Sequence, residues 1–160
     1  MSPSRPGERR LSIPDGSKSE RGTYVLIIAL EHDRLISVGK LGQILFRAGT
    51  YAYCGSAMAG YRGRVGRHFS SEKKLHWHID YLLLEAEPVG AFLVPGGAGV
   101  ECSLGRLISS LDGSEAIEGF GASDCPCRSH LYRIEESAIQ NMIEEISRLS
   151  SGINPPPEND

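Results

Sequence analysis

Two tyrosines lead into a Cys-Gly-Ser sequence within the stretch GTYAYCGSA, residues 49–57. If this stretch is a strand, its period of two places Tyr51 and Tyr53 on one face, and Ala52 and Cys54 on the other. Packing would be an ordinary reason for two tyrosines in a strand, since tyrosine favours half-buried strand positions. The alternative is that a phenol is delivered to a site that binds phosphate, because an arginine-rich segment follows directly.

Basic residues are concentrated in the block that contains this stretch. The chain has a net charge of −3, which argues against a protein that coats nucleic acid without discrimination. From Lys40 to Lys74, however, Glu72 alone opposes a run of basic residues, namely Lys40, Arg47, Arg62, Arg64, Arg67, Lys73 and Lys74. A basic block in an acidic chain predicts a local patch that binds phosphate, with a solvated helix face as the ordinary alternative.

Two tripeptides and the arginines that follow them resemble a known family pattern. Gly22-Thr23-Tyr24 opens the first expected strand, and Tyr53-Cys54-Gly55 closes a later one. This spacing resembles the GIY-YIG nuclease superfamily, in which two such strands lie side by side and the next helix supplies an essential arginine. The segments YAYCGSA, HWHIDYL, VECSLGRL and GFGASDCPCRSHL together are similar to the Uri branch of predicted endonucleases. The resemblance covers residues 22–133, with cysteine in place of the isoleucine of YIG.

The resemblance implies a metal-dependent endonuclease that hydrolyses phosphodiester bonds of nucleic acid, with DNA as the expected substrate. It implies that Tyr24 activates the attacking water and that Tyr53 helps to order the site. An unperturbed phenol has a pKa of about 10, so Tyr24 would need a neighbouring metal or cation to act as a base. Arg64 is the expected phosphate partner, since a guanidinium makes two parallel hydrogen bonds to phosphate. His68 stands where many relatives have tyrosine or histidine.

The expected substrate-binding residues surround these catalytic candidates in the sequence. Arg64 lies one residue beyond the commonest family spacing, so Arg62 and Arg67 remain candidates for its role. The residues expected to bind substrate are Gly55, Ser56, Arg62, Arg67, Lys73 and Lys74.

The resemblance also requires one glutamate on a later helix to hold a divalent metal. Glu101 opens an expected helix and is the first candidate, with Asp80 and Glu85 as alternatives. A carboxylate at a helix N-terminus is also favoured by the helix dipole alone, by about 0.3 to 1 kcal/mol. Mg²⁺ or Mn²⁺ is the expected ion, because both favour oxygen ligands.

A second group of candidate metal ligands lies near the end of the chain. Cys125, Cys127 and His130 form C-x-C-x-x-H, a pattern of zinc-type ligands. Zinc knuckles usually space their cysteines by two residues, so a tight turn capped by the neighbouring Asp and Ser side chains is the preferred interpretation. His130 or His78 could instead belong to the nuclease site, and a thiol enzyme using Cys125 is a weaker alternative.

Three further residues have ordinary structural interpretations. Trp77 is expected to pack in the core. Cys54 and Cys102 are expected to be small buried residues.

The elements expected to position these residues alternate between strands and helices. Apolar periodicity predicts a strand over residues 22–30, a hairpin that follows it, a strand over AGTYAYCGS, and a later strand in PVGAFLVPGG. Helices are predicted over AMAGYRGRVGRHF, HWHIDYLLLEA, ECSLGRLISSL and ESAIQNMIEEISRL, and a glycine- and cysteine-bearing loop ends in a last strand. The fold class expected from this order is α/β (α+β), with a small mixed sheet of GIY-YIG type flanked by helices.

The chain length of 160 residues suits one domain. Its polar ends predict a disordered leader over residues 1–21 and a disordered tail over 151–160, around a domain at 22–150. No apolar run approaches the roughly 18 to 20 residues that span a bilayer, so no membrane partner is expected. Without a signal-like segment the expected compartment is the cytoplasm, where cysteines stay reduced. A non-catalytic nucleic-acid-binding module, with a structural zinc loop, is the alternative function.

Overall fold

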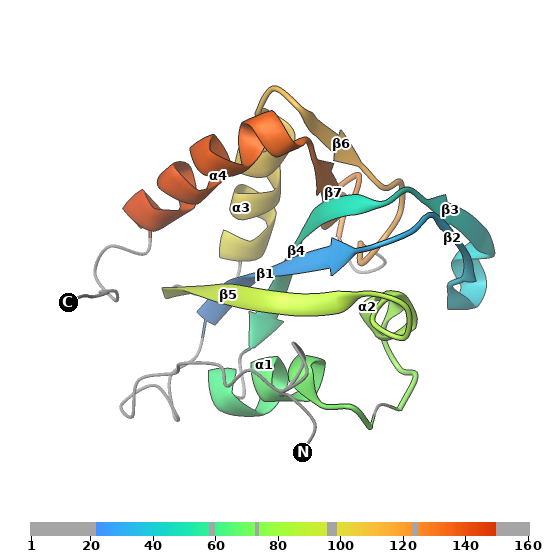
Figure 1. Cartoon of the computed structure of the whole chain (residues 1–160). Coiled ribbons are helices and arrows are strands. Elements are labelled where there is room, and N and C mark those ends of the chain that lie inside the picture. Colours follow the sequence, from blue (N-terminus) through green and yellow to red (C-terminus); the bar gives the residue numbers. More distant parts are fainter. Residues whose placement is uncertain (1–21, 58–59, 73, 96–98, 123–124, 150–160) are drawn as a thin grey trace, which may run out of the picture.

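A five-stranded sheet lies between two layers of helices in the computed structural model (Figure 1). The structure describes residues 22–57, 60–72, 74–95, 99–122 and 125–149. The expected leader at 1–21 and tail at 151–160 lie outside these residues. The strands are β1 (Gly22–Leu30), β2 (Arg34–Ser37), β3 (Gln43–Phe46), β4 (Gly49–Ala57), β5 (Glu87–Pro95), β6 (Ser114–Ala116) and β7 (Leu131–Ile134). The helices are a 3-10 turn, η3 (Gly39–Leu41), and α1 (Tyr61–Phe69), α2 (His78–Leu82), α3 (Val100–Ser109) and α4 (Glu136–Leu149).

The strand order in the main sheet is β5-β1-β4-β7-β6, and β2 and β3 form a separate hairpin. The α+β class is confirmed. The described pairings are all antiparallel, so the sheet differs from the expected mixed sheet. The reason is that β1 lies between β4 and β5, which both run opposite to it, and β7 in turn runs opposite to β4. Among the described helices, none combines the length and apolar composition needed to cross a membrane.

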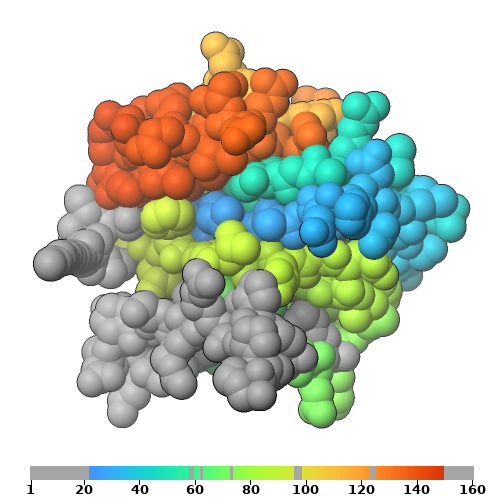
Figure 2. All heavy atoms as spheres, in the orientation of Figure 1, coloured from blue at the N-terminus to red at the C-terminus, as the bar shows by residue number. Residues whose placement is uncertain are grey.

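Alternation along the central strands divides the interior into two cores, one on each face of the sheet. Tyr24 of β1 and Tyr51 and Tyr53 of β4 belong to the core under α1 and α2. Ala52 and Cys54 belong to the core under α3 and α4. The predicted division of β4 is therefore confirmed. Figure 2 shows α4 packed over the sheet, with β1 and β5 forming the middle of this face.

The helix α1 packs its apolar side on the β1–β4 face despite its glycines. Tyr61 and Val65 are fully buried, as their four-residue spacing predicts. His68 is also fully buried on this side of the helix, although it is polar. The fold therefore places one imidazole between α1 and the strand that carries Tyr24.

Candidate active site and cysteine cluster

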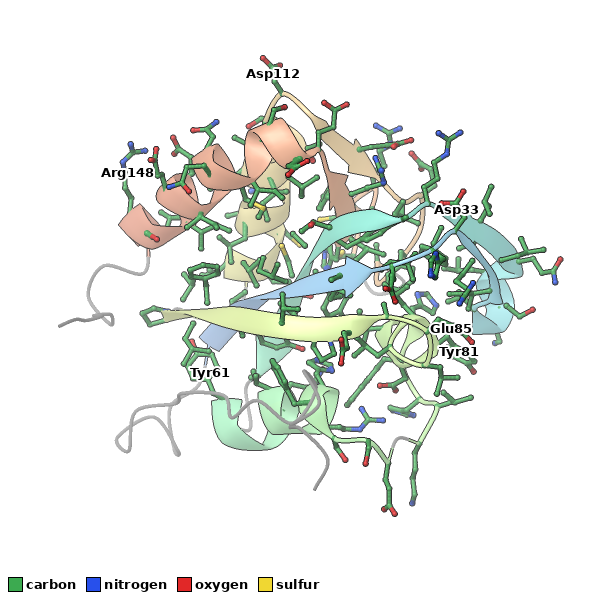
Figure 3. All side chains as sticks on the ribbon, in the orientation of Figure 1. Asp33, Tyr61, Tyr81, Glu85, Asp112 and Arg148 are labelled. Carbon is green, nitrogen blue, oxygen red and sulfur yellow. The ribbon has the colours of Figure 1, made fainter. Side chains whose placement is uncertain are left out.

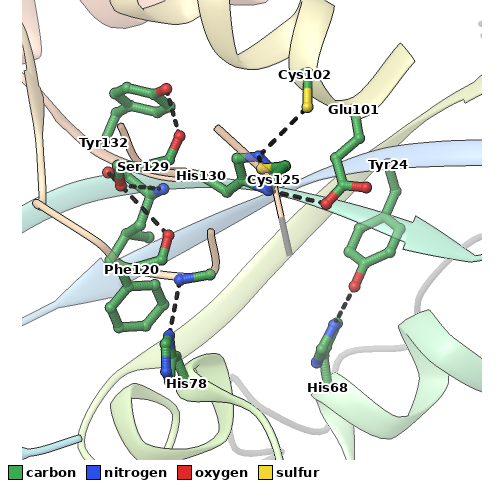
Figure 4. A network of polar contacts seen from close by, with 12 residues as sticks. Tyr24, His68, His78, Glu101, Cys102, Phe120, Cys125, Ser129, His130 and Tyr132 are labelled. Atoms are coloured by element: carbon green, nitrogen blue, oxygen red, sulfur yellow. Dashed lines mark hydrogen bonds and ion pairs between the residues drawn. The ribbon is translucent and has the colours of Figure 1, made fainter. Parts of the chain in front are cut away.

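A buried hydrogen bond joins the first strand to the helix α1. The phenol oxygen of Tyr24 lies 2.6 Å from Nε2 of His68 (Figure 4). Burial raises the pKa of Tyr24 well above its ordinary value, with a smaller contribution from Tyr53. The phenol therefore stays protonated and can donate its hydrogen bond to the imidazole when Nε2 of His68 carries no proton. The Tyr53 ring completes this group, with its centroid 6.3 Å from the Tyr24 ring and 6.2 Å from the His68 ring.

Gly55 leaves room for the Tyr24 ring, because glycine has no Cβ atom. The two residues are directly opposite in the β1–β4 pairing. A Cβ atom at Gly55 would overlap the Oη and Cζ atoms of Tyr24 and would lie 2.9 Å from Cε1. The sequence placed Gly55 among the substrate-binding residues, whereas the structure shows a steric reason for glycine at this position.

Gly55→Ala should therefore move the Tyr24 ring and break its hydrogen bond to His68. Because the side chains of Tyr24 and His68 are fully buried, we expect the free energy of unfolding to fall by about 1 to 3 kcal/mol, the usual range for overpacking. Chemical denaturation measures this change, and Gly90→Ala in β5 is the matched control, since a Cβ there meets no atom within 4 Å. Equal stability of Gly55→Ala and the parent would contradict this role.

Arg64 lies against Trp77, an aromatic side chain that was predicted to pack in the core. Its Cζ atom lies 3.9 Å from the centroid of the Trp77 ring, and that of Arg67 lies 4.2 Å away. Trp77 is partly buried at the margin of the core. The positive charge of Arg64 opposes the burial that raises the pKa values of Tyr24 and Tyr53. Trp77 thus orients a guanidinium that acts on both phenols.

Arg67 and Asp80 form an ion pair with each other. Asp80 is fully buried, and its Oδ2 lies 2.9 Å from Nη2 of Arg67. The same oxygen accepts hydrogen bonds from the backbone N–H groups of His76 and Trp77. Arg67 also donates to the Lys74 carbonyl, at 2.6 Å. The structure therefore gives Arg67 a structural ion pair in place of a free phosphate-binding position, and Asp80 is committed to that pair.

The remaining binding candidates are spread around these residues. Ser56 is half-buried in β4, and Lys74 is exposed. The Arg62 side chain and Lys73 lie outside the part of the chain that the structure describes. Glu85, an alternative metal ligand, lies in the turn after α2 and pairs with Arg34 of β2 at 3.2 Å (Figure 3).

Glu101 connects the tyrosine group to a second cluster. It lies in the first turn of α3, with its side chain 29% exposed and Oε2 2.9 Å from Nδ1 of His130. Its negative charge contributes to the raised pKa values of Tyr24 and Tyr53, and Figure 4 shows its carboxylate between His130 and Tyr24. Tyr24, Tyr53, Arg64, His68 and Glu101 therefore lie near one another, with Tyr24 and His68 fully buried.

The second cluster contains three cysteines and His130. The ligand atoms of Cys102, Cys125, Cys127 and His130 lie within 4.8 Å of one another. Such a cluster could hold a metal, and its sulfur and imidazole donors fit zinc better than Mg²⁺ or Mn²⁺. Cys102 is partly exposed and belongs to this cluster, so its prediction as a small buried residue is wrong, whereas the prediction for Cys54 is confirmed.

The other interpretations of the cysteine loop have different outcomes. The capped turn depends on residues 123–124, which lie outside the described part of the chain. His78 does not join the tyrosine group, since its Nδ1 accepts a hydrogen bond from the Gly121 N–H at 2.8 Å. Burial lowers the pKa of His78, which agrees with a neutral ring that accepts this bond.

Comparisons with known proteins identify one family. No curated protein and no solved structure matches this chain. Residues 23–151 match the family model described as "Domain of unknown function DUF123". Because this match covers most of the 160 residues, the chain belongs to the DUF123 family, whose function is unknown.

Proposed function

We propose that this protein is a metal-dependent endonuclease of the GIY-YIG type, in its Uri branch, and that it acts on DNA. The observation that carries the proposal is the convergence of Tyr24, Tyr53, Arg64, His68 and Glu101 around the paired strands β1 and β4. Residues from two strands and two helices meet there, and their chemical types are those that phosphodiester hydrolysis requires.

The proton chemistry would use the Tyr24–His68 pair. A phenol with a raised pKa is a poor base by itself, but it can give its proton to Nε2 of His68, 2.6 Å away, as it takes one from water. The positive charge of Arg64 favours this transfer, because it stabilises the negative charge that develops on the phenol oxygen between the loss of one proton and the gain of the other. The pair would therefore work as a relay in which His68 receives the proton.

The carboxylate of Glu101 would hold one Mg²⁺ or Mn²⁺ ion. Its Oε2 faces His130, and its partial exposure leaves the other oxygen for an ion that favours oxygen ligands. When bound, such an ion would stabilise negative charge on a phosphate oxygen. His130 would fix the orientation of the carboxylate, and Arg64 would pair with the phosphate.

A non-catalytic nucleic-acid-binding module is the second candidate. It is favoured by the full burial of Tyr24 and His68 and by the pairing of Glu101 with His130, since both could be structural. In this case Arg64 and the exposed lysines would bind phosphate without cleavage. For either function the cytoplasm is the proposed compartment, because the four cysteines, which all lie in the described part of the chain, form no disulfide.

A panel of labelled substrates separates these two functions. Single-stranded, duplex, flapped and branched DNA, and the same forms of RNA, should be incubated with the protein with and without Mg²⁺ or Mn²⁺. The proposal predicts that at least one DNA form is cut only when the ion is present. Binding to the panel without cleavage of any member would contradict it and would favour the binding module.

Arg64→Ala should weaken both binding and cleavage, because it removes the phosphate partner. Loss of one phosphate contact should lower the slope of log K against log salt by about one. Binding measured over a range of salt concentrations gives this slope. Arg34→Ala is the matched control. It removes the same charge from β2, where Arg34 forms an ion pair with Glu85. Equal salt slopes for the two variants would exclude Arg64 as a phosphate ligand.

A further inference from the structure

The cysteine cluster joins two distant parts of the chain. Cys102 lies on α3, whereas Cys125, Cys127 and His130 belong to the loop before β7. Thiols are weak donors and weak acceptors, so hydrogen bonding gives little reason for three of them to meet one imidazole. Coordination of a shared cation gives a clear reason, because thiolate and neutral imidazole are strong ligands of the same ion.

The nitrogen-to-sulfur distances in the cluster are close to those that a tetrahedral ion imposes. With zinc bonds of about 2.3 Å to sulfur and 2.0 Å to nitrogen, a sulfur and a nitrogen ligand lie roughly 3.5 Å apart. Nε2 of His130 lies 3.4 Å from Sγ of Cys125 and 3.9 Å from Sγ of Cys102. The four side chains therefore need only small shifts to bind one ion.

The other nitrogen of His130 has the partner typical of a zinc ligand. Nδ1 faces Oε2 of Glu101 at 2.9 Å, while Nε2 faces the sulfurs (Figure 4). Histidines that bind zinc usually donate their second N–H to a carboxylate or carbonyl, which fixes the tautomer and the ring orientation. The His130 backbone is fixed as well, since its N–H donates to Phe120 and its carbonyl accepts from Cys54 in β4.

We infer that Cys102, Cys125, Cys127 and His130 bind one structural Zn²⁺ ion, and that Glu101 is a positioning residue of this zinc site. Four protein ligands make a closed site, which has no position for a reacting water. The ion ties the loop before β7 to α3. Through His130 it also fixes the carboxylate that lies beside Tyr24. Zinc binding itself does not depend on the proposed nuclease activity.

Metal analysis of the full chain is the first test. Protein produced with zinc in the medium, under reducing conditions, should contain close to one zinc per chain. After removal of zinc, titration with Co²⁺ should produce thiolate-to-cobalt charge transfer in the ultraviolet and the visible bands of a tetrahedral ion. Protein that takes up neither ion while folded by circular dichroism, or that holds two of these cysteines as a disulfide, would overturn the inference.

Two cysteine variants test the ligand assignment. Cys102→Ala should lower the zinc content and weaken the cobalt charge-transfer band, because one of three thiolates is lost. Cys54→Ala is the matched control, since Cys54 is buried in the core outside the cluster and should leave both unchanged. If Cys102→Ala fails to fold, the intensity of the charge-transfer band of the parent still counts its thiolates. A full zinc content in folded Cys102→Ala, or a band too weak for three thiolates, would contradict the assignment.

Glu101→Gln tests the positioning role without any nucleic acid. Loss of the carboxylate beside a zinc-bound histidine should weaken zinc binding by about 10-fold to 100-fold, measured by competition with a fluorescent chelator. Glu85→Gln, beside β2, should leave the affinity unchanged. Equal zinc affinities for Glu101→Gln and the parent would remove Glu101 from the zinc site. Because cleavage is not measured, this result stands apart from the fate of the proposed nuclease.

Discussion

Replacing Glu101 with glutamine should lower the rate of Mg²⁺-dependent cleavage by about a hundredfold or more, the scale expected for loss of one charge-stabilising group. The substitution keeps the size of the side chain but removes the negative charge that would hold the ion. Binding of uncut substrate in buffer without Mg²⁺ should stay nearly unchanged, since a neutral residue repels phosphate less than a carboxylate does. Single-turnover cleavage and a binding titration measure the two effects separately.

The control for this prediction has to account for zinc. Both Glu101→Gln and the parent should be assayed with their zinc content measured, so that a lost zinc ion does not imitate a lost magnesium ion. Glu85→Gln removes the same charge from a carboxylate that pairs with Arg34 away from Tyr24, and it should cleave at the parent rate. Cleavage by Glu101→Gln at the parent rate would show that another carboxylate holds the ion.

Tyr24→Phe should reduce cleavage by about 10² to 10⁴, the range for loss of a general acid–base group. The phenyl ring can occupy the same position, but it has no proton to pass to His68. The variant should also lose about 1 to 3 kcal/mol of unfolding free energy, because a buried imidazole nitrogen loses its partner. Single-turnover cleavage and chemical denaturation measure these two quantities.

Tyr51→Phe separates the chemical effect from the structural one. Tyr51 is a buried tyrosine of β4 on the same face, and its hydroxyl donates to the Arg47 carbonyl at 2.6 Å. Its removal should lower stability to a similar degree and leave cleavage at the parent rate. Equal cleavage rates for the Tyr24 and Tyr51 variants would mean that the Tyr24 phenol has no part in the reaction.

Most of the elements could be predicted from apolar periodicity. The strand at residues 22–30 and the inward residues of α3 and α4 follow from the spacing of their apolar side chains. The short strand β6 was not predicted, since three residues of the sequence SEA have neither the length nor the composition of a typical strand. Whether neighbouring strands pair parallel or antiparallel depends on the connections between them, which apolar periodicity does not specify.

The sequence identifies candidate site residues more clearly than it shows which of their side chains lie together in the fold. The motifs place Tyr24 and Tyr53 together because paired strands share a face. The links of Trp77 to Arg64 and of Asp80 to Arg67 join α1 to the start of α2, and no local spacing encodes them. Cys102 completes the cysteine cluster only after α3 packs on the sheet, which explains why the pattern C-x-C-x-x-H alone favoured a turn.

The dependence of cleavage on Mg²⁺ tests the central proposal most directly. Zinc-loaded parent protein should be mixed in excess with a labelled DNA from the panel, and the single-turnover rate measured as Mg²⁺ is raised from zero. The proposal predicts no cleavage without Mg²⁺, a rate that rises and saturates with the ion, and replacement of Mg²⁺ by Mn²⁺. A rate independent of both ions, or DNA that is bound but left uncut at every concentration, would contradict it.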